Sequence, residues 1–124
     1  MRAVTLSRGD GSIVCERCFL AVTIPSRMRG LLGRSSLPPG EGMLLRPAGS
    51  IHTMFMRFPI DAVFLDRELH IVDVVSNVRP WRLTGRRGAH SVVELAAGEA
   101  IRRGLTPGER LALGEEERDD PAER

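Results

Sequence analysis

Short runs of apolar and β-branched residues, separated by glycine, proline and small polar residues, extend along most of this chain. Runs of this length and composition predict β-strands rather than helices. Residues 60–65 and 69–75 form the clearest pair, and the acidic and basic residues between them predict a hairpin. The complete set of predicted strands covers residues 2–6, 12–15, 19–23, 43–45, 60–65, 69–75, 91–95 and 109–113.

Two segments have the pattern of short helices. Pro25 suits the first position of a helix, and apolar residues then recur at the spacing of one helical face, which predicts a helix over residues 25–32. A second short helix is predicted over residues 97–103, where Gly104 ends the pattern. Residues 77–89 are rich in arginine and glycine and predict a long basic loop.

These elements predict a mainly β fold. Many short strands joined by glycine and proline turns, with two short helices, are typical of a compact β-sandwich or a small barrel. The length of 124 residues fits one domain, which is enough to bury a hydrophobic core.

The charge is unevenly distributed and suggests where the domain ends. Residues 115–124 contain six acidic residues and two arginines, whereas residues 1–114 contain sixteen arginines and ten acidic residues. The acidic, apolar-poor end predicts a disordered tail. We therefore expect a single β-rich domain over residues 1–114, followed by an acidic tail over residues 115–124.

The overall composition indicates a soluble globular protein, with 42% hydrophobic and 27% charged residues. No apolar run reaches the roughly 18 residues that a membrane-spanning helix needs, and the N-terminus has no apolar segment typical of a secretory signal. We expect a cytoplasmic protein with no membrane partner. All basic residues apart from histidine are arginine, which is typical of a GC-rich genome, and we expect a bacterial source.

Several segments, in order, resemble one known family, the domain of unknown function 192 family (uncharacterised protein family 0127). The earlier segments are 29–34 (Arg-Gly-Leu-Leu-Gly-Arg), 42–45 (Gly-Met-Leu-Leu), 51–53 (Ile-His-Thr) and 56–66 (Met-Arg-Phe-Pro-Ile-Asp-Ala-Val-Phe-Leu-Asp). The later segments are 71–72, 80–82 (Pro-Trp-Arg), 93–98 (Val-Glu-Leu-Ala-Ala-Gly) and 104–108 (Gly-Leu-Thr-Pro-Gly).

The resemblance implies a compact, jelly-roll-like β-rich domain with short helices at its edges. It implies no established activity, cofactor or substrate. Many members carry Trp-Met-Lys-Asn-Thr before a Pro-Leu-Asp element, whereas residues 52–58 here read His-Thr-Met-Phe-Met-Arg-Phe. A subsite built from that Lys-Asn-Thr segment is therefore not carried over to this chain.

The stretch from Ser50 to Asp66 concentrates aromatic residues and potential site groups. A cleft with a few polar groups in an apolar wall commonly holds a small ligand or a peptide strand. The leading hypothesis is therefore a non-enzymatic binding or interaction domain whose partner is a small molecule or a peptide. Its predicted ligand-binding residues are His52, Met56, Arg57, Asp61 and Glu94.

An alternative hypothesis is a small hydrolase or isomerase. His52 would act as the general base, and Asp61 would orient it. The sequence contains no Ser-His-Asp order, no phosphate-binding glycine loop and no paired-carboxylate motif, so we assign no catalytic residue beyond these two candidates. The sequence therefore favours a non-enzymatic protein over an enzyme, and we expect no cofactor.

Glu94 lies within an apolar run, so strand alternation directs it either outward or into the core. A buried carboxylate needs a partner, and an arginine such as Arg57 or Arg34 would supply one.

Cys15 and Cys18 form a Cys-x-x-Cys motif that could close a disulfide or supply half of a zinc site. No second cysteine pair is present, and the three histidines are not paired at ligand spacing. We therefore expect ordinary buried thiols and no metal.

A second alternative is nucleic-acid binding through the loop from Arg79 to Arg87. Its arginines could contact phosphates, and Trp81 could stack on a base. The modest charge of the domain makes nucleic acid a less favoured partner than a small molecule or a peptide.

Overall fold

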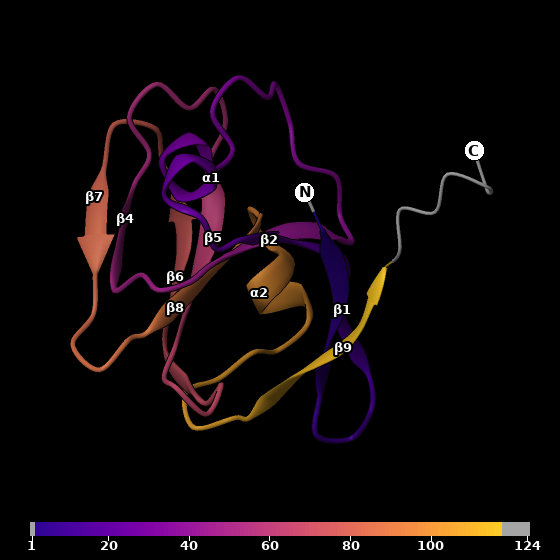
Figure 1. Ribbon diagram of the computed structural model, residues 1–124. Coiled ribbons are helices and arrows are strands. Elements are labelled where there is room, and N and C mark those ends of the chain that lie inside the picture. Colours follow the sequence, from indigo (N-terminus) through magenta and orange to yellow (C-terminus); the bar gives the residue numbers. More distant parts are fainter. Residues whose placement is uncertain (1, 118–124) are drawn as a thin grey trace, which may run out of the picture.

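The structure, a computed structural model, describes residues 2–117. These residues form nine strands and two short helices (Figure 1). The strands are β1 (Ala3–Arg8), β2 (Ile13–Ala21), β3 (Glu41–Leu45), β4 (Ser50–His52), β5 (Ile60–Leu65), β6 (Ile71–Val78), β7 (Leu83–Gly85), β8 (Ser91–Ala96) and β9 (Leu111–Glu117). The helices are α1 (Ile24–Arg29) and α2 (Glu99–Arg102). The predicted mainly β class with two short helices is confirmed.

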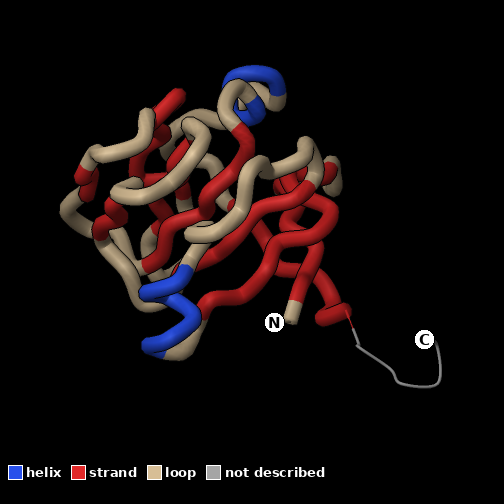
Figure 2. Tube along the Cα trace, turned by 90° about the horizontal axis from the view of Figure 1, so that it is seen from above, coloured by secondary structure: helices blue, strands red, loops and turns tan. Residues whose placement is uncertain are grey.

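Seven strands form one mixed sheet in the order β6-β5-β8-β3-β2-β1-β9, and β4 pairs with β7 in a separate ribbon. All neighbouring strands are antiparallel except β2 and β3, which are parallel. Parallel neighbours require a crossover connection. Residues 22–40, which include α1, provide this connection above one face of the sheet (Figures 1 and 2).

The large sheet curls until its two edges meet, which makes the domain barrel-like. An isolated bridge pairs His70, next to β6, with Arg110, next to β9. The Ile71 N–H also donates to the Glu109 carbonyl at 2.8 Å, and the Leu111 N–H donates to the Leu69 carbonyl at 2.9 Å. These bonds cover edges that would otherwise expose unpaired backbone groups.

The curled sheet separates two hydrophobic clusters. Inside the curl lie side chains from β1, β2, β3, β5, β8 and β9, together with Ala100 of α2. On the outer face of β3, β5 and β8, a second cluster is covered by the crossover and by the β4–β7 ribbon. Consequently β5 is buried at every position and β8 at all but its last. The two helices lie on opposite sides of the strands (Figure 2).

Two differences from the predicted strands have a local cause. The predicted runs 12–15 and 19–23 fall largely within one strand, β2, which continues through residues 16–18; a bulge there inserts one extra residue opposite the β1 segment between Val4 and Leu6. The predicted loop 77–89 contains the short strand β7, which pairs with β4. Period-two patterns cannot reveal either a bulge or a three-residue strand.

The first helix is shorter than predicted. Thr23 and Ser26 form a reciprocal capping box at its start, with Pro25 in the first turn. The helix stops at Arg29 because Gly30 adopts a backbone conformation with φ 48° that an α-helix cannot continue. The predicted helix over residues 25–32 is therefore wrong in its last turn.

The C-terminal strand extends beyond the predicted end of the domain. β9 runs to Glu117, so the first three residues of the predicted tail, residues 115–117, belong to the sheet. The rest of that tail, residues 118–124, lies outside the described residues. Within residues 2–117, neither helix is long and apolar enough to cross a membrane.

Asp61 of β5 is fully buried and joins three elements inside the curled sheet. Its Oδ1 accepts the N–H of Asn77 at 2.9 Å, where a bulge interrupts the pairing of β5 with β6. Its Oδ2 accepts the N–H groups of Gly98 and Ala100, at 3.0 and 2.9 Å, at the start of α2. Hydrogen bonds from backbone N–H groups to a carboxylate are stronger than those between neutral groups, so Asp61 fastens β6 and α2 to β5.

Replacing Asp61 with asparagine is expected to lower the free energy of unfolding by about 2–4 kcal/mol. The amide would direct an N–H₂ group at backbone donors that now bind carboxylate oxygen, so at least one buried donor would lose its partner. Urea unfolding followed by circular dichroism measures the change. The control is Asp10→Asn, at an exposed turn where Oδ1 accepts the N–H of Ser12, and it should cost less than about 1 kcal/mol. Equal losses in both variants would contradict the anchoring role of Asp61.

Candidate ligand-binding pocket

A pocket of about 340 Å³ lies between the α1 crossover and the segment from Pro47 to His52, over the outer face of the sheet. This volume is within the range of small-molecule sites. The wall is largely apolar and includes Ile24, Met28, Leu31, Leu32, Leu45, Ile51 and Met56.

Glu94 is the acidic residue that lines this pocket. It lies in the middle of β8, directly opposite Met43 of β3 on one side and Ala62 of β5 on the other. Its exposed fraction is only 3%. Among the described residues, no hydrogen bond or ion pair engages its carboxyl group, although buried carboxyl groups normally have such partners.

The α1 crossover approaches Glu94 at Gly30. A Cβ atom at this position would lie 3.9 Å from Glu94 Oε1, an ordinary van der Waals contact, so the crossover backbone passes directly beside the carboxyl group. The left-handed φ of Gly30 turns the chain sharply at the end of α1. The helix end therefore forms a wall beside the acid.

Burial raises the pKa of Glu94 to about 8. The low-dielectric surroundings disfavour the charged form, and no cation is close enough to compensate. The carboxyl group is therefore mainly neutral at pH 7. A neutral carboxyl can donate one hydrogen bond and accept others, so it suits an uncharged polar group of a ligand.

The remaining ionisable residues that line the pocket are Arg27, Arg29 and His52. Arg29 and His52 are exposed, and Arg27 is partly exposed, with its Nη1 donating to the Val22 carbonyl at 3.2 Å. The pocket thus combines a neutral acid at depth with basic groups nearer to solvent.

The five predicted ligand-binding residues are not all brought together. His52, Met56 and Glu94 line the pocket, whereas Arg57 is exposed and does not. Asp61 points into the curled sheet, on the face of β5 opposite to Ala62 and therefore opposite to Glu94.

The structure does not supply the geometry of the alternative enzyme hypothesis. Asp61 is occupied by backbone donors, and among residues 2–117 no hydrogen bond or ion pair joins it to His52. His52 is exposed at the end of β4. Within the described residues, no carboxylate contacts the imidazole to orient it as a general base.

The predicted arginine partner of Glu94 is also wrong. Arg34 binds Glu41 instead, with 3.0 Å between Arg34 Nη2 and Glu41 Oε1. Arg57 precedes β5 in an irregular exposed segment, where strand alternation does not apply. Glu94 avoids the need for a counter-ion because it is protonated.

Cys15 and Cys18 are free, fully buried thiols in the inner cluster. Residues three apart on a regular strand face opposite sides, but the β2 bulge turns both thiols inward. A hydrogen bond between them lowers the pKa of Cys15 and raises that of Cys18, and burial adds to the increase at Cys18. In the described part of the chain, no third histidine, cysteine or carboxylate joins them in a metal-binding group.

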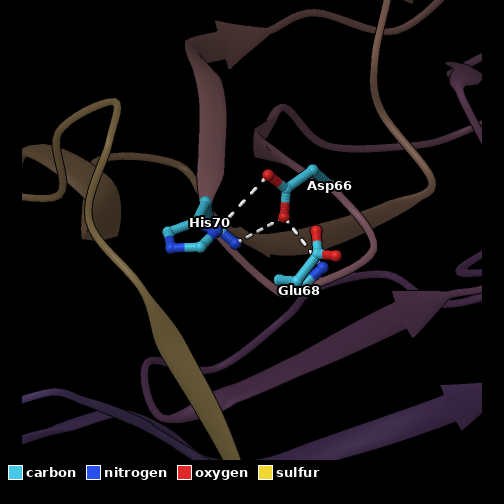
Figure 3. A group of neighbouring side chains, drawn as sticks. All are labelled: Asp66, Glu68 and His70. Atoms are coloured by element: carbon cyan, nitrogen blue, oxygen red, sulfur yellow. Dashed lines mark hydrogen bonds and ion pairs between the residues drawn. The ribbon is translucent and has the colours of Figure 1, made fainter.

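One group of three potential metal ligands lies in the β5–β6 turn, formed by Asp66, Glu68 and His70 (Figure 3). Asp66 Oδ1 accepts the backbone N–H groups of Glu68 and His70 at 2.9 and 2.8 Å, and Oδ2 lies 3.4 Å from His70 Nδ1. These hydrogen bonds lower the pKa of Asp66. The contacts explain the cluster as the internal bracing of an exposed turn.

The basic loop from Arg79 to Arg87 has less free positive charge for nucleic-acid binding than its sequence indicates. Arg86 Nε lies 2.6 Å from Asp73 Oδ2, so part of its charge is neutralised. Trp81, by contrast, is 55% exposed, and its ring packs on Phe55 with 4.7 Å between centroids.

The sequence interpretation missed the contribution of the crossover to the pocket, including Arg27, Arg29 and Gly30. The sequence feature that corresponds to this part of the wall is the Arg-Gly-Leu-Leu-Gly-Arg segment at 29–34. Its position over β8 depends on the parallel pairing of β2 with β3, which local patterns do not reveal.

The fold is that of a small β-barrel-like domain with two short helices. The chain belongs to the DUF192 family, described as "Uncharacterized ACR, COG1430", whose model matches residues 5–113. The resemblance inferred from the motifs is confirmed, and the family has no established function.

Three similar proteins match most of this chain, one by sequence and two by structure. A UPF0127 protein from Thermococcus sibiricus (strain DSM 12597 / MM 739) is 31% identical over 98 residues, which cover 75% of this chain but only 63% of that protein. A crystal structure from Sinorhizobium meliloti 1021, described as a candidate transcription regulator, has a TM-score of 0.80 at 26% identity and covers 91% of this chain and 94% of its own. A protein of unknown function from Novosphingobium aromaticivorans DSM 12444 has a TM-score of 0.76 at 24% identity, with coverage of 89% and 83%.

Glu94→Gln is expected to change how stability depends on pH. The unfolded chain loses its Glu94 proton near the ordinary pKa of 4.5, whereas the folded chain keeps it to about 8. Between these values the unfolded state binds fewer protons, so this group makes stability fall as pH rises, by at most about 1.4 kcal/mol per pH unit. Its contribution is complete below the unfolded pKa and is lost as pH passes through the folded pKa.

Glutamine mimics the neutral acid, so the variant should lack this contribution and gain stability relative to the parent as pH rises from about 5 to about 9. Urea unfolding across that range measures the difference. Glu68→Gln, at an exposed turn, is the control and should leave the slope unchanged. Parallel pH curves for the parent and Glu94→Gln would show that the Glu94 pKa is not raised.

Proposed function

We propose that this protein is a non-enzymatic binding domain that holds a small molecule in the pocket over Glu94. The observation that carries the proposal is the carboxyl group of Glu94, a residue that is only 3% exposed; this group lacks a partner within the described residues and lines a pocket of ligand size. A buried polar group of this kind gains a hydrogen bond when a ligand supplies the missing partner.

The pocket chemistry supports one class of ligand. The apolar wall favours an apolar body, and the neutral Glu94 favours an uncharged carbonyl or hydroxyl group. Arg27, Arg29 and His52 favour an anionic group nearer to solvent. A cationic ligand is disfavoured, because these basic residues would repel it and Glu94 is neutral at pH 7 and would not attract it. The proposed ligand is therefore a small anion with an apolar body and a neutral hydrogen-bonding group.

A nucleic-acid function, the second alternative from the sequence, has less support. The Sinorhizobium meliloti relative is described as a candidate transcription regulator, yet no helix within residues 2–117 of this chain exceeds six residues. A recognition helix in the major groove is longer than this. The ion pair between Arg86 and Asp73 also reduces the free positive charge of the basic loop. We propose a cytoplasmic role in a bacterial cell, in line with the composition.

The test uses four probes that share one alkyl chain: hexanoate, 2-oxohexanoate, 1-hexanol and hexylamine. Binding to the full chain is followed by chemical shifts of the pocket residues and by titration calorimetry. We expect 2-oxohexanoate to bind most tightly, because it offers both the anion and the carbonyl acceptor, and hexylamine most weakly. The affinity of 2-oxohexanoate should fall as pH rises through about 8, because Glu94 then ionises and repels the anion.

Two variants locate the site. Glu94→Leu removes the hydrogen-bonding group and should weaken the binding of 2-oxohexanoate by about tenfold. Glu94→Gln keeps a donor and should bind nearly as well as the parent at pH 7. The absence of saturable shifts at Ile51, His52 and Met56 with every probe would overturn the proposal, as would tightest binding by hexylamine.

A further inference from the structure

A second surface of the molecule, separate from the pocket, gathers large apolar side chains in solvent. Phe55 is 70% exposed, Leu83 73%, Trp81 55% and Met54 42%. We name these four residues the apolar tip. They come from residues 54–55 and 81–83, which are distant in sequence but adjacent in space, because His52 pairs with Leu83 across the β4–β7 ribbon and the Phe55 and Trp81 rings are in contact.

The tip is held rigidly by Thr53, which is fully buried. The Thr53 Oγ1 donates to the Arg79 carbonyl at 2.6 Å and accepts the Arg82 N–H at 2.9 Å. The Thr53 backbone N–H donates to the Arg82 carbonyl, and its carbonyl accepts the N–H of Trp81 at 3.0 Å. One residue therefore fastens the two loops that carry the exposed rings.

The backbone at the tip is unusual. Phe55 has φ 65° and Trp81 has φ 66°, a left-handed conformation that aromatic residues rarely adopt. Strain of this kind persists only when neighbouring contacts impose it, and it is concentrated at functional sites. Here the imposed conformation places two aromatic rings in water rather than in a core.

The two loops that carry the tip contain positive charge but no acidic residue. Residues 53–59 and 79–83 include three arginines and no aspartate or glutamate. Within the two loops, Arg57, Arg79 and Arg82 are all exposed. The partner that complements this surface is therefore anionic and presents apolar material beneath its charge.

We propose that the apolar tip docks on an anionic phospholipid surface. Tryptophan and phenylalanine are favoured at the boundary between lipid headgroups and acyl chains, and arginines next to them attract anionic headgroups. The sequence predicted no membrane partner because it lacks a spanning segment. Docking of this kind needs no spanning segment, since only four side chains enter the boundary.

The same residues fit single-stranded nucleic acid less well. A base stacks on an open aromatic face, but the Phe55 and Trp81 rings pack on each other at an interplanar angle of 59°. Met54 and Leu83 are aliphatic and offer no stacking surface, whereas both suit a lipid environment.

Trp81 is the only tryptophan of the chain, so its fluorescence reports on the tip without a label. The full chain is titrated with vesicles of phosphatidylcholine, alone or mixed with phosphatidylglycerol. With the mixed vesicles we expect a blue shift of Trp81 emission and sedimentation of the protein. Binding to pure phosphatidylcholine should be weaker by about tenfold or more. Raising the salt concentration should weaken binding to the mixed vesicles.

Two sets of variants locate the contact. Phe55→Asn with Leu83→Thr keeps the Trp81 reporter, and asparagine tolerates the left-handed backbone at position 55. This variant should bind mixed vesicles about tenfold less well or worse. Its control is Ile101→Asn, which removes a side chain of α2 that is 73% exposed and should not alter binding.

Arg79→Gln with Arg82→Gln should likewise weaken binding, whereas Arg67→Gln with Arg110→Gln, a charge-matched change at the β5–β6 turn and before β9, should not. Far-ultraviolet circular dichroism verifies that every variant is folded.

Three results would overturn the proposal. The first is an unchanged Trp81 spectrum with mixed vesicles. The second is an equal loss of binding in the tip variants and their controls. The third is a Trp81 shift produced by oligothymidylate, or by raising the protein concentration alone, but not by vesicles, which would assign the tip to nucleic acid or to a second copy of this chain.

Discussion

The burial of β5 and β8 on both faces is the constraint on which the rest of this structure depends. Each strand contributes side chains to two separate hydrophobic clusters, so any polar residue on them is removed from water whichever way it points. Asp61 and Glu94 meet this constraint in different ways. Asp61 finds three backbone donors, whereas Glu94 gives up its charge.

This difference gives the two acids different roles: Asp61 supports the fold, whereas Glu94 is suited to bind a ligand. A carboxylate whose lone pairs are filled by backbone groups is part of the framework, and its removal affects folding. A neutral acid without partners has unused hydrogen-bonding capacity, and the pocket beside it is where that capacity can be used. The exposed tip is a third arrangement, in which apolar side chains are kept out of the core by a strained backbone. The three arrangements differ in what remains unsatisfied: no hydrogen bond at Asp61, a hydrogen-bonding partner at Glu94, and an apolar contact at the tip.

The sequence predicted the class of fold well, because strand runs, turns and the family motifs are local features. The β5–β6 hairpin appeared as expected, and Pro25 lies in the first turn of α1, which begins one residue earlier, at Ile24. The site was predicted only in part. His52, Met56 and Glu94 line the pocket, but alternation could not tell which face Glu94 occupies when both faces are buried. The bulges at Cys15–Cys18 and Asn77 shift the alternation by one residue, and the crossover becomes a pocket wall only through long-range pairing.

The crossover has one further property. None of the six residues of α1 is buried, so this helix forms part of the pocket without belonging to either hydrophobic cluster. Substitutions on it carry little penalty for folding, while the strand residues opposite are fixed by packing on both sides. For the binding function proposed above, a pocket with one exposed wall and one packed wall would allow the ligand to change through a few surface mutations. The same barrel could therefore serve different ligands in different lineages.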